Sequence, residues 1–396
     1  MSRAGREPAE DVKRRIVAAC GQAGLTVLLA RMYLRHDQND RVICVQAARP
    51  DRCTMSERLG KVICKMSAYR RREDWMGKTS KMMFVAWIAS STTLAAAFAG
   101  SPEEFWGQWR GPSGSGVASR AIPPAEWSES RNVRWKCKLP GEGASSPIVW
   151  GDMVYVQAAI PTSKPAGGTT RPPDTKPAGE RGDSSGDRSG GMPGGLRPQA
   201  QKTSCKFTVL AFERKTGKQV WDRVVCEETP HEGHHPDGTF SSGSPMTDGE
   251  HIFAYFGSRG LYCLTMRGEI VWKKDFGDMQ TRNGFGEGNS PALHGDTIVV
   301  NWDHEGGSFV VALDKRSGNQ RWKQSRDEVT SWSTPLVITD SNPVQVVTSA
   351  TKRVRSYDLS SGKVLWECGG LGGGCVATPV AGAGIASWQS YYGQNK

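Results

Sequence analysis

The sequence is poor in the patterns that mark several common kinds of site. It has ten cysteines, but no two stand in Cys-x-x-Cys spacing, which a structural zinc site commonly shows. Between residues 205 and 370, no segment keeps the 3.6-residue apolar period over the length of a useful helix. These absences exclude a zinc module and a helical bundle.

The positive charge of the chain is unevenly distributed. The formal net charge is +11, and residues 1–75 hold sixteen basic and nine acidic side chains, with Lys78 and Lys81 close behind. The rest of the chain is therefore near neutrality and lacks the basic patch of a nucleic-acid-binding protein. We expect no nucleic-acid partner.

What the sequence does contain is a repeat. The motif Gly-x-x-x-Trp recurs four times, each time followed by a new segment that opens at a proline, and the last three intervals between these prolines are 46, 44 and 44 residues. The copies are Gly217–Trp221, Gly268–Trp272, Gly318–Trp322 and Gly362–Trp366, and the prolines are Pro147, Pro245, Pro291, Pro335 and Pro379. A period of about 45 residues is that of a propeller blade.

Each unit is predicted to form four short strands, A to D in chain order. In the unit that opens at Pro291 these are SPALHG, TIVVNW, SFVVALD and NQRWKQS, separated by the turn-forming breaks GD, EGG and KRSG. The predicted fold class is all-β, a β-propeller of four-stranded antiparallel blades. About four blades are complete, and the fifth unit stops soon after it starts, so we expect a C-terminally incomplete ring.

The repeated tryptophans are expected to pack between neighbouring blades, because a residue found in every blade serves the repeat and not one site. Trp135 has the same local sequence but no strands A to C before it. We therefore predict that residues 131–138 form a strand D that one terminus contributes to close the ring. The structural set is Trp135, Trp221, Trp272, Trp322 and Trp366.

The segment before the repeats has the layout of a secretory signal peptide. Residues 76–99 run from Lys78 and Lys81 through an apolar stretch of about fifteen residues to an Ala-Phe-Ala cleavage site. The stretch is short for a membrane-spanning helix, so no span is expected in the mature protein. Residues 1–75 are then a spurious or disordered extension, the true start is Met76 or Met82, and residues 100–396 are a periplasmic or secreted propeller domain.

Two further features lie within the first unit. Cys205 and Cys226 are equally distant from the turn at Lys215–Thr216, so a regular hairpin would set them opposite each other for a disulfide. A bulge would break that register and leave two buried thiols. Residues 161–204 form an insertion with too few apolar residues to fold, and we predict a disordered surface loop there.

The units resemble a known repeat family. ALDKRSGNQRW-type turns, together with PHEGHHPDGTFSSGSP and VTSATKRVRSYDLSSGKVLWECGG, resemble the pyrroloquinoline-quinone (PQQ)-like repeat of quinoprotein alcohol dehydrogenases and of the barrel-assembly lipoprotein BamB. The resemblance covers residues 105–370 and implies the fold and export. More narrowly, these segments resemble a group of exported bacterial PQQ-like propeller proteins of no established activity.

The resemblance implies a cofactor only weakly. PQQ with calcium is possible by family resemblance, but quinoprotein dehydrogenases are typified by an adjacent Cys-Cys disulfide, and this chain has no adjacent cysteines. No catalytic residue can therefore be assigned from the family. The signal ends in AFAGSPEE, with no cysteine at the cleavage point to take a lipid anchor.

The unusual polar residues are predicted to share one face of the propeller. In a meander blade the D-to-A and B-to-C loops emerge on the same side, and the A-to-B and C-to-D turns on the other. Metal-ligand candidates on that face are His231, His234, His235, Asp303, His304 and Glu305, whose side chains suit zinc, manganese or iron. Candidates for a different ligand are Arg259, Arg282, Asn283 and Glu287. The bland alternative is that these residues cap blade ends, and His231–His235 has no helical context for a metalloprotease motif.

Two classes of function stay open from the sequence. One is a non-catalytic binding or scaffold module that presents this face to a protein, an envelope polymer or a small ligand. The other is an enzyme that uses a quinone or a metal there, such as a dehydrogenase. This type of fold hosts both classes, so the sequence does not decide between them.

Overall fold

The structure is a computed structural model that describes residues 42–46, 104–118, 121–165, 203–369, 371–372, 374–382 and 384–389. The expected signal peptide, most of the expected N-terminal extension and most of the insertion lie outside the described residues. No helix of the described part is long and apolar enough to cross a membrane.

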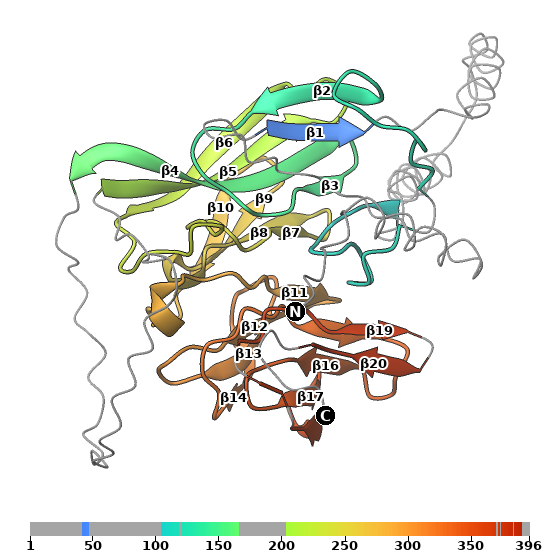
Figure 1. The fold of residues 1–396 in the computed structure, drawn as a ribbon, viewed down its shortest axis with the longest axis vertical. Coiled ribbons are helices and arrows are strands. Elements are labelled where there is room, and N and C mark those ends of the chain that lie inside the picture. Colours follow the sequence, from blue (N-terminus) through green and yellow to red (C-terminus); the bar gives the residue numbers. More distant parts are fainter. Residues whose placement is uncertain are drawn as a thin grey trace, which may run out of the picture.

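Four sheets of four antiparallel strands form the body of the molecule (Figure 1). In each, the strands follow one another in chain order, so they correspond to strands A to D of the predicted units. The first sheet contains β3 (Ile148–Trp150), β4 (Met153–Pro165), β5 (Thr203–Glu213) and β6 (Gln219–Glu228). The second contains β7 (Met246–Thr247), β8 (His251–Tyr255), β9 (Leu261–Thr265) and β10 (Ile270–Lys274). The prediction of four-stranded antiparallel blades is confirmed.

The third sheet contains β11 (Ala292–His294), β12 (Thr297–Trp302), β13 (Phe309–Asp314) and β14 (Gln320–Ser325). The fourth contains β15 (Leu336–Ile338), β16 (Gln345–Thr348), β17 (Val354–Asp358) and β18 (Val364–Cys368). Two short ribbons complete the strand set, β1 (Val42–Gln46) with β2 (Val133–Lys138) and β19 (Val380–Gly382) with β20 (Ile385–Ser387). The 3-10 turns η3 (Gly257–Arg259) and η4 (Arg282–Gly284) lie in connecting loops.

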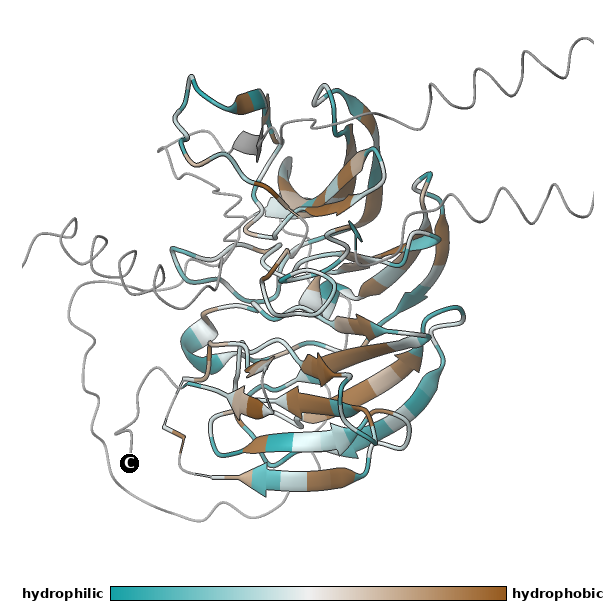
Figure 2. Cartoon of the chain, turned by 90° about the vertical axis from the view of Figure 1, so that its right-hand side faces the viewer, coloured by the Kyte–Doolittle hydropathy of each residue, from teal (hydrophilic) through white to brown (hydrophobic). Residues whose placement is uncertain are grey.

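The core lies between the faces of successive sheets. Ile148 and Phe207 of the first sheet pack with Ile252 and Leu264 of the second, and similar clusters join the second sheet to the third and the third to the fourth. The central strands are covered on both faces, and all six residues of β12 are buried. The outer strands β6, β10, β14 and β18 are largely exposed, which explains their mixed composition (Figure 2).

Four of the five repeated tryptophans lie against a glycine of the next sheet. A β-carbon on Gly217 would come within 2.5 Å of Trp135, and the same relation joins Trp221 to Gly268, Trp272 to Gly318 and Trp322 to Gly362. These glycines also have positive φ values between 69° and 85°, which a side chain disfavours. The glycine of a Gly-x-x-x-Trp motif therefore contacts the tryptophan of the preceding unit, and the tryptophan of the same motif contacts the glycine of the next sheet.

A second repeated contact explains the Ser/Thr-Pro starts. The backbone N–H of Ser146 donates to Ser244 Oγ at 2.9 Å, Ser244 N–H donates to Ser290 Oγ at 2.9 Å, and Ser290 N–H donates to Thr334 Oγ1 at 2.9 Å. Ser244, Ser290 and Thr334, which each precede a proline, thus accept a bond from the equivalent residue of the preceding unit. We call this chain of bonds the Ser/Thr relay.

The strand at residues 131–138 packs as predicted but pairs differently. Trp135 of β2 packs on the first sheet with Val154, Leu210 and Phe212, and its indole N–H donates to Arg214 O at 2.9 Å. Its antiparallel partner strand is β1. The prediction was a strand D that one terminus contributes to close the ring, whereas among the described residues β2 pairs with β1; the packing of Trp135 on the first sheet is as predicted.

The predicted disulfide is not formed. Two bulges between β5 and β6 shift the register, so that Cys205 lies opposite Glu228 and Cys226 lies opposite Phe207. Both cysteines remain thiols, and burial raises the pKa of Cys226 to about 11. The prediction assumed a regular hairpin, and the bulges overturn it.

Candidate functional site

A pocket opens on the face formed by the D-to-A and B-to-C loops. It is partly open to solvent, and about 40 Å³ of it is accessible to the centre of a water molecule. It lies among the loop 230–243, the end of β8 with η3, and the loop 286–289. Four of the predicted site residues line it together with several aromatic side chains. The principal lining residues are His231, His234, Phe240, Tyr255, Arg259 and Glu287.

Arg259 is the centre of the charged side of the pocket. Its guanidinium donates to Glu228 Oε2 at 2.7 Å and to Asp278 Oδ1 at 2.6 Å, and it lies 2.9 Å from His231 Nδ1. The other ring nitrogen of His231 is 2.5 Å from Met279 O. Arg259 therefore joins the loop after β6 to the loop after β10, and its charge is already balanced.

Two carboxylates fix the neighbouring loops. Glu232 accepts bonds from Thr281 N–H at 3.1 Å and from Thr281 Oγ1 at 2.5 Å. Glu287 accepts from Ser258 N–H at 2.6 Å and from the Ser258 hydroxyl. Burial raises the pKa of Glu287, although the two bonds from Ser258 act in the opposite direction. Both acids therefore hold backbone in place.

The two remaining histidines of this loop flank the pocket. His234 Nδ1 lies 2.7 Å from His235 O, and its Nε2 lies 3.7 Å from Glu142 Oε2. His235 Nδ1 accepts the backbone N–H of Asp237 at 3.1 Å. The loop can approach this closely because Gly286 has no side chain, and a β-carbon there would lie 2.9 Å from His234 Cβ.

Arg282 and Asn283 do not line the pocket. Both are exposed in η4, where Asn283 has a positive φ of 58° and the Arg282 backbone N–H donates to Thr330 Oγ1 at 2.8 Å. Of the four predicted ligand-face residues, the structure thus brings Arg259 and Glu287 into the pocket and leaves these two outside it.

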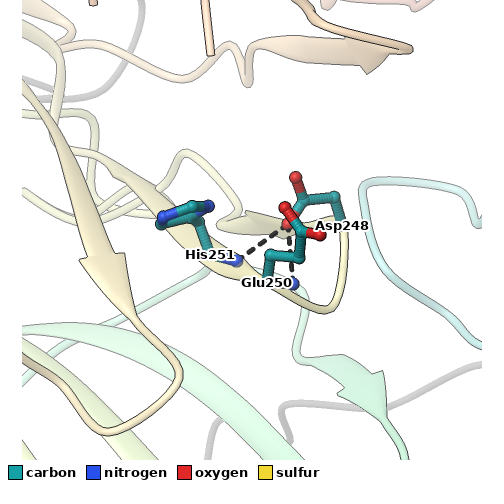
Figure 3. A group of neighbouring side chains, drawn as sticks. All are labelled: Asp248, Glu250 and His251. Atoms are coloured by element: carbon teal, nitrogen blue, oxygen red, sulfur yellow. Dashed lines mark hydrogen bonds between the residues drawn. The ribbon is translucent and has the colours of Figure 1, made fainter. Parts of the chain in front are cut away.

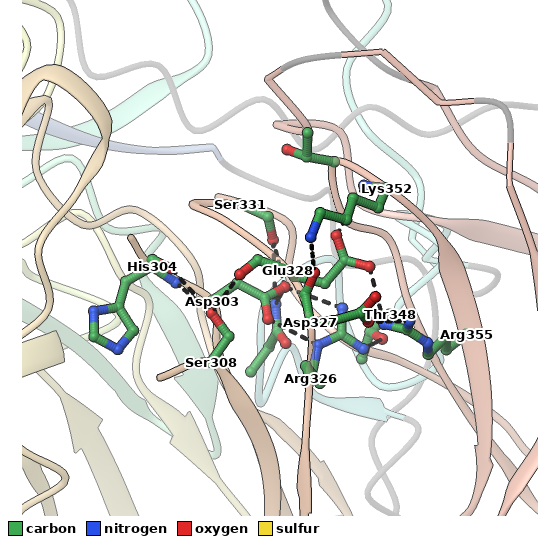
Figure 4. A network of polar contacts seen from close by, with 12 residues as sticks. Asp303, His304, Ser308, Arg326, Asp327, Glu328, Ser331, Thr348, Lys352 and Arg355 are labelled. Atoms are coloured by element: carbon green, nitrogen blue, oxygen red, sulfur yellow. Dashed lines mark hydrogen bonds and ion pairs between the residues drawn. The ribbon is translucent and has the colours of Figure 1, made fainter. Parts of the chain in front are cut away.

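The residues after β12 belong to a separate buried network (Figure 4). Asp303 pairs with Arg326 at 2.8 Å, and neither side chain is exposed. Arg326 also donates to Thr348 Oγ1 at 2.8 Å and to the Tyr357 hydroxyl at 2.6 Å. Burial alone would lower the pKa of Arg326, but Asp303 and Tyr357 raise it, so the guanidinium stays charged. This network ties the third sheet to the fourth.

His304 and Glu305 are also engaged within the protein. His304 is buried beside Trp302, and its Nδ1 accepts the Gln280 backbone N–H at 3.1 Å. Glu305 accepts from the Thr330 hydroxyl at 2.8 Å. His304 therefore lies in the loop between β12 and β13 as expected, but its side chain is buried and bonded within the protein.

One group of potential metal ligands was not predicted. Asp248, Glu250 and His251 lie at the turn between β7 and β8, and their candidate ligand atoms lie within 4.8 Å of one another (Figure 3). Asp248 already accepts the N–H groups of Glu250 and His251, and its other oxygen lies 2.9 Å from Lys315 Nζ. A lysine ammonium therefore occupies the place where a cation would bind Asp248. The signal in the sequence was only Asp-Gly-Glu-His, which is an ordinary turn.

The pocket residues can be compared with the ligands that a calcium-bound quinone would need. Calcium takes six to eight oxygen ligands, several of them carboxylates. Among the residues that the structure describes, Glu232 and Glu287 already accept hydrogen bonds from Thr281 and Ser258, and no third carboxylate joins them within the range of one ion. The pocket residues do not fit this group.

The match to a family model covers residues 206–369, from within β5 to the end of β18, and that family is described as outer membrane protein assembly factor BamB. The matched region contains the second, third and fourth sheets with the repeated Trp–Gly contact. Residues 206–369 are therefore similar to the PQQ-like, BamB-like β-propeller repeat.

Two solved structures are similar to this PQQ-like propeller. BamB from Moraxella catarrhalis is 14% identical, with a TM-score of 0.35, over 48% of this chain and 55% of that one. Quinohemoprotein alcohol dehydrogenase from Comamonas testosteroni is 10% identical, with a TM-score of 0.35, over 63% of this chain and 39% of that one. The chain thus spans about half the length of the first of these proteins and less of the second. No curated protein matches the sequence.

Proposed function

We propose that this PQQ-like propeller is a non-catalytic binding module whose D-to-A and B-to-C loop face holds its partner. The observation that carries the proposal is that the charged groups of the pocket hold its loops in place. Arg259, Glu232 and Glu287 each join two different loops through short hydrogen bonds. A pocket built in this way is formed before any ligand arrives, which lowers the entropy cost of binding.

The same geometry speaks against acid–base catalysis in the pocket. A general base must have an accessible atom for the proton of a substrate. Both ring nitrogens of His231 have partners at hydrogen-bond distance, and both oxygens of Glu287 accept bonds from Ser258. A rigid recognition surface is therefore favoured over an enzyme.

The partner we propose is a protein, an envelope polymer or a small ligand outside the cytoplasm. This location rests on the signal-like sequence at residues 76–99. Intact-mass analysis of the protein recovered from cells tests it, and we expect a mature N-terminus at Gly100. Recovery of a peptide from residues 1–75 would contradict this location.

The binding role is tested by site-specific photo-crosslinking on the full chain. A photoreactive residue replaces exposed Asp237 on the loop face, and the matched control carries it at exposed Arg316 on the opposite turn face. We expect adducts with components of a bacterial envelope extract from position 237 and none from position 316. Equal adducts from both positions, or PQQ-dependent and calcium-dependent dye reduction by the full chain, would overturn the proposal.

A further inference from the structure

Three buried polar atoms without a hydrogen-bond partner gather at the pocket. Among the described residues these include the Tyr255 hydroxyl, Ser241 Oγ and Gln157 Oε1, and all three side chains belong to residues that are 1% exposed. Tyr255 itself lines the pocket, and Ser241 stands between the lining residues Phe240 and Ser242. Such atoms are uncommon in folded proteins, and each calls for a water or a ligand to complete it.

Gln157 is connected to the same wall. Its Nε2 donates to Gly243 O and to Tyr255 O, each at 2.6 Å. Because both partners are carbonyl oxygens, the orientation of the amide is fixed, and Oε1 is the acceptor that lacks a donor. The Gln157 oxygen needs a hydrogen-bond donor, and the two hydroxyl groups can donate and accept. A ligand hydroxyl group can satisfy both needs, because it too donates and accepts.

The charged groups of the pocket are already engaged within the protein. Arg259 is ion-paired with Glu228 and Asp278, whereas Glu232 and Glu287 accept hydrogen bonds from Thr281 and Ser258. An anion would meet no uncommitted cation at these positions, and a cation would have to compete with the hydrogen bonds that the two carboxylates already accept. These commitments select against charged ligands, because a buried charge without a partner is costly.

The rest of the lining is partly aromatic. Phe207, Phe240 and Phe256 contribute to it, and the His234 ring stands edge-on to Phe240 with centroids 4.5 Å apart. Apolar walls with a few polar atoms are typical of pockets for small molecules. Burial, reinforced by the nearby Glu287 charge, raises the pKa of Tyr255 well above its usual value. The phenol therefore stays protonated and can act as a hydrogen-bond donor.

We propose that this pocket binds a neutral, hydroxyl-rich small molecule such as a sugar, with the Tyr255 hydroxyl as a specific hydrogen-bonding group. The inference rests on the proposed binding role of the loop face and names the chemistry of one ligand there. Ser241 and Gln157 stand behind the same wall and complete the polar set.

The test is calorimetric titration of the full chain with matched sugars. Glucose, galactose and N-acetylglucosamine are the neutral probes, and gluconate and glucosamine are the charged ones. We expect at least one neutral sugar to bind and both charged analogues to bind at least about tenfold more weakly. Tyr255→Phe should weaken the binding of the neutral sugar by about tenfold.

The melting temperature separates a ligand-binding role from a structural one. Because the Tyr255 hydroxyl has no hydrogen-bond partner among the described residues, Tyr255→Phe should melt at or above the temperature of the wild type. The matched control is Tyr357→Phe, which removes a buried hydroxyl that is bonded to Arg326 at 2.6 Å and lies in the fourth sheet. It should melt lower than the wild type and bind the sugar unchanged.

Several results would overturn the inference. They are no binding of any neutral sugar, equal binding of a charged analogue, or unchanged binding by Tyr255→Phe. If the Asp237 crosslinks persist while the sugars fail, only the ligand class is wrong. If the sugars bind with the expected dependence on Tyr255 and the crosslinks are absent, the pocket stands and the wider binding face does not.

Discussion

Trp272 of β10 lies on Gly318, which belongs to the turn between β13 and β14 of the next sheet. A β-carbon on Gly318 would come within 2.8 Å of Trp272 Cε3, and the indole N–H donates to Lys315 O in the same turn at 3.1 Å. Because the contact recurs at Trp135, Trp221 and Trp322, it is the unit that holds successive sheets in register.

Gly318→Ala tests this contact. The substitution adds a methyl group where Trp272 lies and also strains a residue whose φ is 69°. Gly295→Ala is the matched control, since φ there is 56° and no atom lies within 4 Å of the added carbon. We expect Gly318→Ala to lower the free energy of unfolding by at least about 1 kcal/mol more than the control does. Equal losses of unfolding free energy in urea denaturation would show that Trp272 moves aside without destabilising the fold.

Ser290→Ala tests the Ser/Thr relay. It removes the acceptor of the buried Ser244 N–H, and an unpaired buried donor costs about 1–3 kcal/mol. Ser333→Ala is the control, because the Ser333 hydroxyl is buried just before β15 of the fourth sheet and has no hydrogen-bond partner among the described residues. The control should keep or slightly raise the stability. If chemical denaturation gives the two variants the same stability, the relay contributes nothing.

Asp303→Asn tests the buried ion pair. The substitution removes the carboxylate that is directly paired with the buried Arg326 guanidinium, and loss of one partner of a buried pair costs about 3–5 kcal/mol. Asp152→Asn removes an exposed partner of Arg214 and should cost less than about 1 kcal/mol. Thermal melting of both variants measures the difference. A loss at Asp303 no greater than that at Asp152 would mean that water reaches Arg326.

Asp314 gives a pH dependence. The hydrogen bond from Arg321 lowers the pKa of Asp314 to about 2, aided by the Ser317 and Arg316 N–H groups. A lowered pKa means that the carboxylate stabilises the fold above its unfolded-state pKa and loses this effect as the pH falls from about 4 through about 2. Solvent limits the effect to less than about 1 kcal/mol. The stability difference between the wild type and Asp314→Asn, measured in urea at pH 6 and pH 2, should shrink at the lower pH. A constant difference would contradict the assignment.

The fold could be predicted because its signals are local and repeated. The apolar runs, the turns and the Gly-x-x-x-Trp spacing all appear within one unit, so four copies reinforce one another. The Cys205–Cys226 pairing could not be predicted, because the two bulges between β5 and β6 leave no clear mark in the sequence.

The site was predicted only in outline. The topology placed His231, Arg259 and Glu287 on one face correctly, since loops of successive blades emerge on the same side. Their partners come from different sheets, as with Arg259 and Glu228 of β6, and no spacing in the sequence encodes such contacts. The burial of the loop residue His304 could not be predicted, because nothing in the local sequence reveals its contacts with Gln280 and Trp302.

The most direct test of the account is hydrogen–deuterium exchange of the full chain with and without a bacterial envelope extract. If the loop face is the binding surface, backbone amides of residues 230–243 and 284–289 should gain protection, while the turns at 214–218 and 315–319 stay unchanged. Protection confined to those turns would place the binding surface on the opposite face and contradict the account.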